Sequence, residues 1–348
     1  MNHEKYMLRC LELAEKGLRA AMPNPSVGAV LVYNDSIIGE GFTSPYGGPH
    51  GEVNCINSVT EENRHLIPNS TLYVSLEPCS HYGKTPPCCD LIIRQQIQNI
   101  VIGTADTHEK VAGNGIKKLR EAGKNVIVGV LEKECRELNK RFFTFNEKKR
   151  PYIILKWAQS ADGFISPESK PDNRPVWITN PYSRQLVHKW RSEEMAILAG
   201  TQTVLSDNPE LNVRDWKGPN PVRVIIDREN KIGDNHSVKN HKIKTIVLTE
   251  KANFPNLENL AYEVVPLDDG FLPAVCNVLH RYNLQSVIVE GGRITLQAFI
   301  NAGLWDEARV FKGQAVFTKG TEAPKFTAAP IKRQEIMNDE LLIFRNYG

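Results

Sequence analysis

The chain has 348 residues, of which 41% are hydrophobic and 24% are charged, and its formal net charge is +3. These values are typical of soluble globular proteins, and no apolar run reaches the length of a membrane-spanning helix. The mild charge and the absence of a long Lys/Arg stripe argue against a large nucleic acid as the substrate. The N-terminus shows no apolar signal segment, so we expect a cytoplasmic protein. The length predicts two domains.

In the first part of the sequence, predicted strands alternate with predicted helices. A helical pattern covers residues 3–20, and a turn with Asn24 between two prolines leads into a strand at 29–32. Asn34-Asp35 predicts a hairpin turn into a strand at 37–39. The other expected elements are strands at 71–76, 99–103 and 126–130 and helices at 51–57, 88–97, 114–122 and 131–140. This alternation implies a mostly parallel sheet with helices on its faces.

A charged run that ends at Pro151 predicts the boundary between a first domain, residues 1–145, and a second domain, residues 146–348. The second domain starts with a strand at 152–156, and Thr179 is expected to cap a helix that continues to about residue 193. Further strands are expected at 195–200, 222–227, 245–249, 286–290, 306–311 and 341–344, with helices that start near 201 and 294. The pattern predicts a second α/β domain.

A group of residues suited to metal binding lies between His50 and Cys88. A catalytic zinc ion keeps three protein ligands and one open position for water, and His50, Cys79 and Cys88 supply these three ligands. Glu52 is then a free carboxylate, which can take a proton from the water and deliver it to a leaving amine. This combination of His-x-Glu with Pro-Cys and a second Cys is typical of zinc deaminases that act on nucleobases.

A structural zinc site is the alternative hypothesis for the same stretch, because structural sites have four Cys or His ligands. Cys89 or His81 would be the fourth ligand. The remaining cysteines are expected to be core thiols in a reducing compartment, and these are Cys10, Cys55, Cys135 and Cys276.

A second candidate site is the segment Glu290-Gly291-Gly292, which ends a strand, forms a glycine turn and begins a helix. Such a corner lets backbone N–H groups approach a phosphate. It lacks the six-residue dinucleotide fingerprint, and most glycine turns after strands are only turns.

The segment from Pro78 to Cys89 closely resembles the metal loop of the bifunctional deaminase–reductases of riboflavin biosynthesis. Its two cysteines are far apart compared with the Cys-x-x-Cys pattern of other nucleobase deaminases. The likeness continues through Asn24–Gly28 and through Ser160–Gly163 and Val289–Gly292 in the second half. It implies an N-terminal cytidine-deaminase-like three-layer α/β/α domain and a C-terminal dihydrofolate-reductase-like α/β domain.

The resemblance also implies two consecutive reactions. The first is the zinc-dependent hydrolytic removal of the 2-amino group from 2,5-diamino-6-(5-phosphoribosylamino)pyrimidin-4(3H)-one. The second is the NADPH-dependent reduction of the ribosyl group, which gives 5-amino-6-(5-phosphoribitylamino)uracil. The substrate is thus expected to be a small phosphoribosylated pyrimidine.

The family's functional positions map onto residues of this sequence. The resemblance implies that His50, Cys79 and Cys88 bind zinc and that Glu52 carries protons. The positions matching substrate-binding residues are Asn24, His81, Lys84, Lys156, Arg191, Asp207, Leu211, Arg214 and Glu290. The positions matching NADPH-binding residues are Gln159, Trp177, Thr203, Asp207, Gly291, Gly292, Arg293, Ile294 and Thr295. We expect Lys156 and Glu290 to flank the reacting carbon of the sugar, with Asp207 assisting proton transfer.

The stretch Asp106-Thr107-His108-Glu109 stands where the family usually has Asp-Pro-Asn-Pro, and three single positions also depart from the family pattern. Gly51 replaces the usual Ala, which predicts a looser helix start. Thr43 replaces a His, which removes one polar contact to the substrate, and Pro175 replaces a substrate-contacting Ser.

Two other hypotheses stay open from the sequence. One is a deaminase of another base or of tRNA whose second half is a binding module; the other is a non-catalytic, zinc-stabilised nucleotide-binding protein. The sequence does not decide between NADPH and NADH. Chains with two active sites often form dimers or tetramers, so a homo-oligomer is an expectation.

Overall fold

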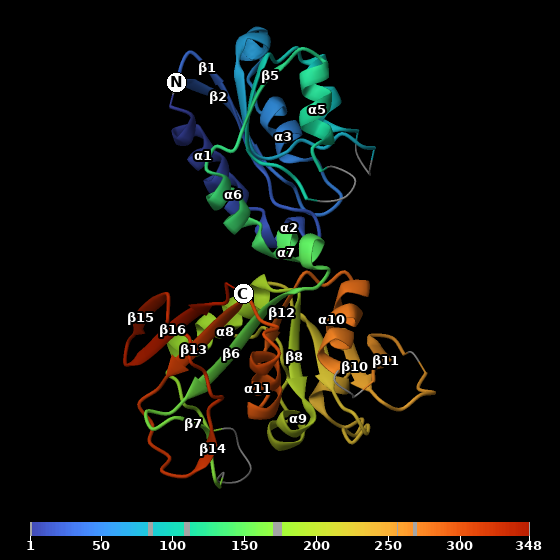
Figure 1. Ribbon diagram of the computed structural model, residues 1–348, viewed down its shortest axis with the longest axis vertical. Helices are drawn as coiled ribbons and strands as arrows, with labels where there is room; N and C mark the ends of the chain where they lie inside the picture. The colour runs from blue at the N-terminus through green and yellow to red at the C-terminus, as the bar shows by residue number, and fades with distance from the viewer. Residues whose placement is uncertain are drawn as a thin grey trace. The chain divides into compact units, whose positions relative to one another are not determined.

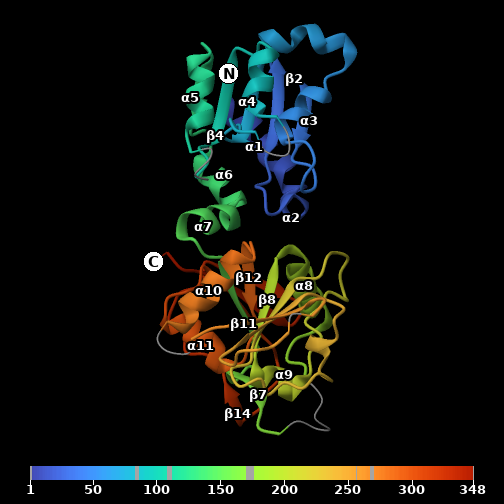
Figure 2. The same cartoon turned by 90° about the vertical axis from the view of Figure 1, so that its right-hand side faces the viewer.

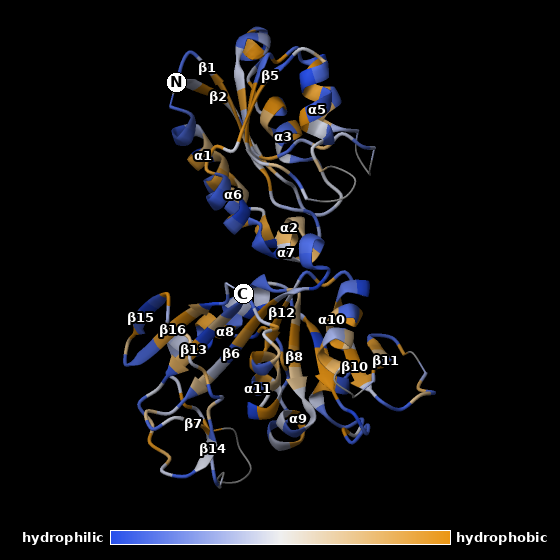
Figure 3. Ribbon diagram, viewed as in Figure 1, coloured by the Kyte–Doolittle hydropathy of each residue, from blue (hydrophilic) through white to orange (hydrophobic). Residues whose placement is uncertain are grey.

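The computed structural model describes residues 2–82, 86–107, 112–169, 176–255, 257–266 and 270–347. The chain divides into two compact units, Met1–Lys149 and Arg150–Gly348 (Figure 1). The division follows Lys149 because helix α7 (Lys140–Lys148) continues through part of the charged run that predicted the boundary. Figure 3 shows that the strands of both units are largely apolar, whereas most helices have one apolar and one polar side.

The first unit contains a five-stranded sheet in the order β2-β1-β3-β4-β5. The strands are β1 (Gly28–Tyr33), β2 (Ser36–Phe42), β3 (Thr71–Leu76), β4 (Asn99–Thr104) and β5 (Asn125–Val128). β3, β4 and β5 are parallel, but β1 is antiparallel to both β2 and β3. Because β1 is antiparallel to both of its neighbours, β2, β3, β4 and β5 all run in the same direction. The prediction of a mostly parallel sheet is therefore confirmed, with β1 as the exception. The predicted hairpin explains the pairing of β1 with β2, because Asn34 and Asp35 both have positive φ and a two-residue turn permits only antiparallel pairing.

Helices cover both faces of this sheet. They are α1 (His3–Glu15), α2 (Leu18–Ala21), α3 (Gly51–Asn57), the 3-10 helix η1 (Glu61–Asn69), α4 (Cys88–Arg94), α5 (Asn114–Glu121), α6 (Glu132–Leu138) and α7. One core cluster joins α3, α4 and α5 to the sheet, and the cluster on the other face joins α1 and α6. Successive strand residues point to opposite faces, so Leu31 belongs to the first cluster and Val30 to the second. This confirms the three-layer α/β/α domain.

The second unit contains a nine-stranded sheet in the order β11-β10-β9-β8-β12-β6-β13-β16-β15. Its strands are β6 (Tyr152–Gln159), β8 (Ala196–Gly200), β9 (Val222–Ile226), β10 (Thr245–Thr249), β11 (Leu260–Val264), β12 (Ser286–Val289), β13 (Glu307–Lys312), β15 (Lys332–Ile336) and β16 (Asp339–Arg345). The sheet is parallel from β11 to β13 and antiparallel beyond. A separate two-stranded sheet pairs β7 (Phe164–Pro167) with β14 (Gly320–Glu322).

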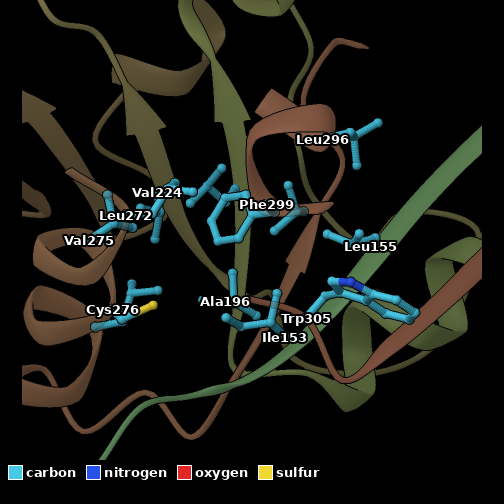
Figure 4. Packing of buried hydrophobic residues seen from close by; sticks show 14 of the residues in the cluster. Ile153, Leu155, Ala196, Val224, Leu272, Val275, Cys276, Leu296, Phe299 and Trp305 are labelled. Atoms are coloured by element: carbon cyan, nitrogen blue, oxygen red, sulfur yellow. The ribbon is translucent and has the colours of Figure 1, made fainter. Parts of the chain in front are cut away.

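Helices also lie on both faces of the large sheet (Figure 2). They are α8 (Pro181–Glu193), α9 (Thr201–Asp207), the 3-10 helix η3 (Ser237–Lys239), α10 (Phe271–Arg281) and α11 (Arg293–Asn301). α8 and α9 pack on the face that carries Ile197 and Ile288, and α10 and α11 pack on the opposite face. Figure 4 shows side chains of the core on the α10 and α11 face, among them Phe299 of α11, Val275 of α10 and Ala196 of β8.

The start of α8 differs from the prediction by one residue. Asn180, not Thr179, caps the helix, because its side-chain oxygen accepts a hydrogen bond from the Ser183 backbone N–H. Pro181 occupies the first helical position, where its missing N–H costs nothing.

The predicted helix at 3–20 is in fact two helices, α1 and α2, which are separated around Gly17. In the described ranges, no helix has the length and hydropathy needed to cross a membrane.

Candidate active sites

Three side chains meet beyond the carboxyl end of β3. His50 immediately precedes α3, Cys88 is the first residue of α4, and Cys79 lies in the loop after β3. Nδ1 of His50 lies 3.6 Å from Sγ of Cys79 and 3.4 Å from Sγ of Cys88. Tetrahedral zinc with ligands at about 2.0–2.3 Å separates its ligand atoms by about 3.5 Å. The three residues therefore fit a zinc ion.

The start of α4 favours a thiolate at Cys79. The Cys88 backbone N–H donates to Sγ of Cys79 over 3.3 Å. Hydrogen bonds from the Cys88 thiol and from His50 lower the pKa of Cys79. Because zinc binds the thiolate and not the thiol, this environment prepares Cys79 as a ligand.

Glu52 lies in the first turn of α3 and is only 3% exposed. Burial raises the pKa of its carboxyl to about 7, and the nearby Cys79 adds to this rise. A carboxyl that titrates near neutral pH can both accept and release a proton during a reaction. Glu52 is therefore suited to proton transfer beside the metal.

The four-ligand hypothesis is not supported. Sγ of Cys89 points to the carbonyl oxygens of Pro78 and Gly115, at 3.3 and 3.6 Å. Burial raises the pKa of this thiol. Within the described part of the chain, the cluster of possible metal ligands contains His50, Cys79 and Cys88 and does not include Cys89 or His81. The site thus has the three-ligand composition of a catalytic centre.

The expected pyrimidine-binding residues are placed only in part. Asn24 is half-buried before β1, and His81 is half-buried in the metal loop with its Nδ1 unpaired among the described residues. Lys84 lies outside the described residues, as does Pro175.

The Asn24 segment has an anchor that the sequence did not predict. The buried side chain of Asn139 accepts from the Ser26 backbone N–H at 3.0 Å and donates to the Ser26 carbonyl at 2.9 Å.

The two remaining single-position departures from the family pattern have packing roles. A Cβ atom at Gly51 would lie 2.4 Å from the Val27 carbonyl oxygen, so the missing side chain lets α3 approach β1. The helix nevertheless begins at Gly51. Thr43 is buried, and its Oγ1 accepts a hydrogen bond from the Val27 backbone N–H at 2.9 Å.

In the second unit, three charged side chains meet near the carboxyl end of β12. Arg191 of α8 donates through Nε and Nη2 to the two carboxylate oxygens of Glu290, at 3.0 and 2.8 Å. Nζ of Lys156, on the neighbouring β6, lies 3.7 Å from the same carboxylate. Burial alone would raise the pKa of Glu290, but Arg191 and Lys156 outweigh it and lower the pKa to about 2. Burial lowers the pKa of Lys156.

A buried histidine holds the segment that contains Arg214. Nδ1 of His188 lies 3.3 Å from the Arg214 backbone nitrogen, and its Nε2 lies 3.3 Å from the Asp215 carboxylate. Burial and the nearby Arg191 lower the pKa of His188 to about 4, so the ring is neutral near pH 7. The sequence analysis missed His188, although it lies three residues before Arg191 and thus on the same side of α8.

The glycine corner lies at a branch point of the sheet. β8 and β12 are neighbours, but the chain leaves β8 towards β9 and leaves β12 towards β13, on the other side of β6. Strand ends that diverge in this way form the usual nucleotide-binding crevice of parallel sheets. The Gly292 backbone N–H donates to Oγ1 of Thr203 at 2.9 Å. A Cβ at Gly200 would lie 2.8 Å from Oγ1 of Thr295, so glycine lets the start of α11 pack closely against the end of β8. The corner therefore has the topology of a dinucleotide site.

The other expected cofactor-binding and substrate-binding residues differ from one another in exposure and in contacts. Trp177 is exposed, with the Arg184 guanidinium 4.4 Å from its ring centre. Ile294 is also exposed, and Arg293 pairs with Glu322 at 3.1 Å. Three positions complete the set: Gln159 accepts from the Trp157 indole, Leu211 is buried beneath α9, and Asp207 is the last residue of that helix.

Together, the fold and the two sites define a zinc-binding deaminase joined to a reductase. The family model "Cytidine and deoxycytidylate deaminase zinc-binding region" matches residues 1–104, and the model "RibD C-terminal domain" matches residues 151–321. The riboflavin biosynthesis protein RibD of Aquifex aeolicus (strain VF5) is 37% identical over 98% of this chain and 97% of its own length. The RibD protein of Escherichia coli (strain K12) is 34% identical over 89% of this chain and 87% of its own.

A solved structure is similar to this chain over nearly its full length. It is a diaminohydroxyphosphoribosylaminopyrimidine deaminase/5-amino-6-(5-phosphoribosylamino)uracil reductase from Thermotoga maritima, with 37% identity, a TM-score of 0.88, and coverage of 99% of this chain and 98% of its own. The chain belongs to the RibD family of riboflavin biosynthesis proteins, and it is a bifunctional enzyme with a deaminase and a reductase domain. The predicted family, fold and pair of cofactors, zinc and NADPH, are confirmed.

Proposed function

We propose that this chain deaminates 2,5-diamino-6-(5-phosphoribosylamino)pyrimidin-4(3H)-one and then reduces the ribosyl group of the product to give 5-amino-6-(5-phosphoribitylamino)uracil. The observation that carries this proposal is the pairing of two different sites in one chain. One is a three-ligand metal site beside the buried Glu52, and the other is a glycine corner beside Lys156 and Glu290, whose side chains are 15% and 10% exposed. The Thermotoga maritima relative carries both activities in its name.

In the deaminase domain, we assign proton transfer to Glu52. His50, Cys79 and Cys88 would hold a zinc ion, which would supply Lewis acidity and make a water molecule more acidic. The Glu52 carboxylate would take a proton from this water and deliver it to the leaving amine. The raised pKa of Glu52 supports this role. The ribotide is held by Asn24, His81 and Lys84, whose amide and cationic groups suit a base edge and a phosphate.

In the reductase domain, NADPH supplies the hydride, and the protein orients the sugar and handles its charge. Lys156 and Glu290 flank the reacting carbon. Because Glu290 stays ionised at every pH well above 2, it fixes Arg191 and Lys156 and does not itself carry a proton. Lys156, whose pKa is lowered by burial, is the better proton donor, with Asp207 as the second proton-handling group.

The remaining assignments rest on the resemblance of these positions to functional positions of the family. Additional substrate contacts are assigned to Arg191, Asp207, Leu211 and Arg214. NADPH contacts are assigned to Gln159, Trp177, Thr203, Asp207, Gly291, Gly292, Arg293, Ile294 and Thr295. The position of the glycine turn at the branch point of the sheet supports the placement of the cofactor at this corner.

We further propose that residues 1–149 carry out the deamination and residues 150–348 the reduction, in a cytoplasmic homo-oligomer, either a dimer or a tetramer. The division into two compact units supports the first statement. The location is supported by the substrates, since phosphoribosylated pyrimidines and NADPH are intracellular metabolites. Mass measurement by light scattering would test the oligomer.

A mass-spectrometric time course tests the function as a whole. The purified, zinc-loaded protein is incubated with the diaminopyrimidinone ribotide, first without and then with NADPH. We expect only the deaminated product in the first run and the ribityl product in the second. No deamination would contradict the assigned substrate, and deamination without reduction would contradict the assignment of the second domain.

A further inference from the structure

The buried carboxylate of Glu77 is used by neither proposed reaction. It follows β3, is 4% exposed, and lies two residues before the zinc ligand Cys79. Four backbone N–H groups donate to it. Oε2 accepts from Asp106 and Gly113, each at 3.0 Å, and Oε1 accepts from Gly115 at 2.8 Å and from Ile116 at 3.1 Å.

These donors come from two separate elements. Asp106 follows β4, whereas Gly113, Gly115 and Ile116 form the start of α5. The first N–H groups of a helix have no partner within the helix, and a buried donor without an acceptor is costly. Glu77 satisfies these donors with charge-assisted bonds, which are the stronger kind. One side chain thus joins the ends of β3 and β4 to the first turn of α5.

The same turn of α5 contacts the metal loop directly. A Cβ at Gly115 would lie 2.1 Å from the Pro78 carbonyl oxygen, so the backbones of α5 and the loop touch. The Cys89 thiol lies within hydrogen-bond distance of the Pro78 and Gly115 carbonyls, and the Cys89 backbone N–H donates to the Cys79 carbonyl at 3.1 Å. The segments that carry Cys79 and Cys88 are therefore both fixed against the turn that Glu77 holds.

We infer that Glu77 is a positioning residue for the zinc site. It fixes the Pro78-Cys79 backbone against α5 and thereby sets the separation of the two thiolate ligands before the metal binds. The inference rests on the proposed zinc-dependent deaminase, but its test measures zinc binding itself. A purely structural role would instead lower the stability of the domain and leave the zinc affinity of the folded protein unchanged.

The test is Glu77→Gln in the full-length protein, with zinc affinity measured by competition with a chromophoric chelator. Glutamine has the same shape as glutamate, but its NH₂ group donates hydrogen bonds and does not accept them. In the variant, this NH₂ group would face two backbone N–H groups that a carboxylate oxygen of Glu77 satisfies in the wild type. We expect zinc affinity to fall about 10–100-fold, the usual effect of removing a group that orients a metal ligand. We also expect a shifted visible absorption spectrum after cobalt substitution, because the ligand geometry changes.

Two controls accompany this variant. Glu121→Gln changes an exposed carboxylate at the other end of α5, which pairs with Lys117 at 3.9 Å, and should leave zinc affinity unchanged. Reduction of 5-amino-6-(5-phosphoribosylamino)uracil by the same Glu77→Gln protein should also be unchanged, because that site lies in the other unit.

Unchanged zinc affinity and an unchanged cobalt spectrum in Glu77→Gln would overturn the inference, even if the domain were less stable. If near-ultraviolet circular dichroism shows that this deaminase domain does not fold, Glu77→Asp replaces it, since it keeps the charge with a shorter reach. A fall in zinc affinity of Glu77→Asp then supports the inference, and wild-type affinity overturns it. Failure of the proposed function would appear separately, as absent deamination by zinc-loaded wild-type protein.

Discussion

Glu52 is buried and the side chain of Glu290 is only 10% exposed, yet their surroundings shift the pKa values of these two active-site carboxyls in opposite directions. Burial dominates at Glu52 and raises its pKa to about 7. At Glu290 the effect of burial is outweighed by Arg191 and Lys156, and the pKa falls to about 2. Such a divergence separates a group that exchanges protons from one that stays charged. The deaminase domain thus has a proton carrier, and the reductase domain has a fixed anion that orients its cations.

The two sites also differ in how the chain assembles them. Cys79 and Cys88 lie only 29 and 38 residues from His50 in the sequence. Arg191 and Glu290 are 99 residues apart in the sequence. They are brought together because helix α8, which carries Arg191, packs on β6 and β12. A site whose residues lie in one short stretch can be recognised in the sequence as a motif. A site whose residues come from distant strands and helices appears in the sequence only as single, separate residues.

The largest expected effect tests the proton carrier. Glu52→Gln should lower the deamination rate about 10²–10⁴-fold, because a group that transfers protons contributes this much. Zinc content, measured by atomic emission, should stay at one ion per chain, since Glu52 is not among the ligands. Near-normal deamination would show that another group moves the proton.

The second variant tests the fixed anion. Glu290→Gln leaves the buried Arg191 and Lys156 without their counter-charge, and breaking such a pair costs about 3–5 kcal/mol. We expect this loss in the urea unfolding of the reductase domain, together with loss of reduction and normal deamination. Glu229→Gln, at an exposed pair with Lys231, is the matched control and should have no measurable effect. Equal stability of both variants would contradict the role of Glu290.

A smaller effect is expected where a distant residue supports the deaminase site. Asn139→Ala removes both hydrogen bonds to the Ser26 backbone, and each buried group left unsatisfied costs about 1–3 kcal/mol. The substrate KM of deamination should rise, because Ser26 lies two residues from Asn24. Asn125→Ala, at an exposed contact with Asn99, should change neither stability nor KM. An unchanged KM in Asn139→Ala would contradict a role of the Asn139 anchor in substrate binding.

The smallest effect concerns pH. The pKa of His188 is about 4 in the folded protein and about 6.5 when unfolded, so unfolding takes up a proton between these values. The stabilising contribution of neutral His188 is complete above about pH 6.5 and is lost as the pH falls towards 4. Urea unfolding of the reductase domain should therefore depend less on pH in His188→Gln than in wild type across this window. Identical pH dependence in both proteins would contradict the shift.

The local motifs account for what the sequence predicted well. His50, Glu52, Cys79 and Cys88 follow a fixed pattern, and the structure brings the three proposed ligands together. The strand at 71–76 has the predicted bounds, and it is buried along its whole length. Periodicity and spacing are sufficient for such elements, since both depend on neighbouring residues.

The sequence was less informative for elements and residues whose structure depends on contacts with distant parts of the chain. Helix α7 was missed because Glu147-Lys148 resembles a solvated linker, although Phe142, Phe143 and Phe145 bury its inner side. The short strands β7, β14 and β15 were missed because they are exposed or half-buried and lack an apolar pattern. Glu77 and His188 carry no motif either, since their partners are backbone groups or side chains that only the fold brings near.

The most direct test of two independent sites in one chain is a comparison of both activities in three proteins. Wild type, Glu52→Gln and Lys156→Ala are each assayed for deamination of the diaminopyrimidinone ribotide and, separately, for NADPH oxidation with 5-amino-6-(5-phosphoribosylamino)uracil. We predict that Glu52→Gln loses only deamination and that Lys156→Ala loses only reduction. Loss of both activities in either variant, or of neither, would contradict two separate sites.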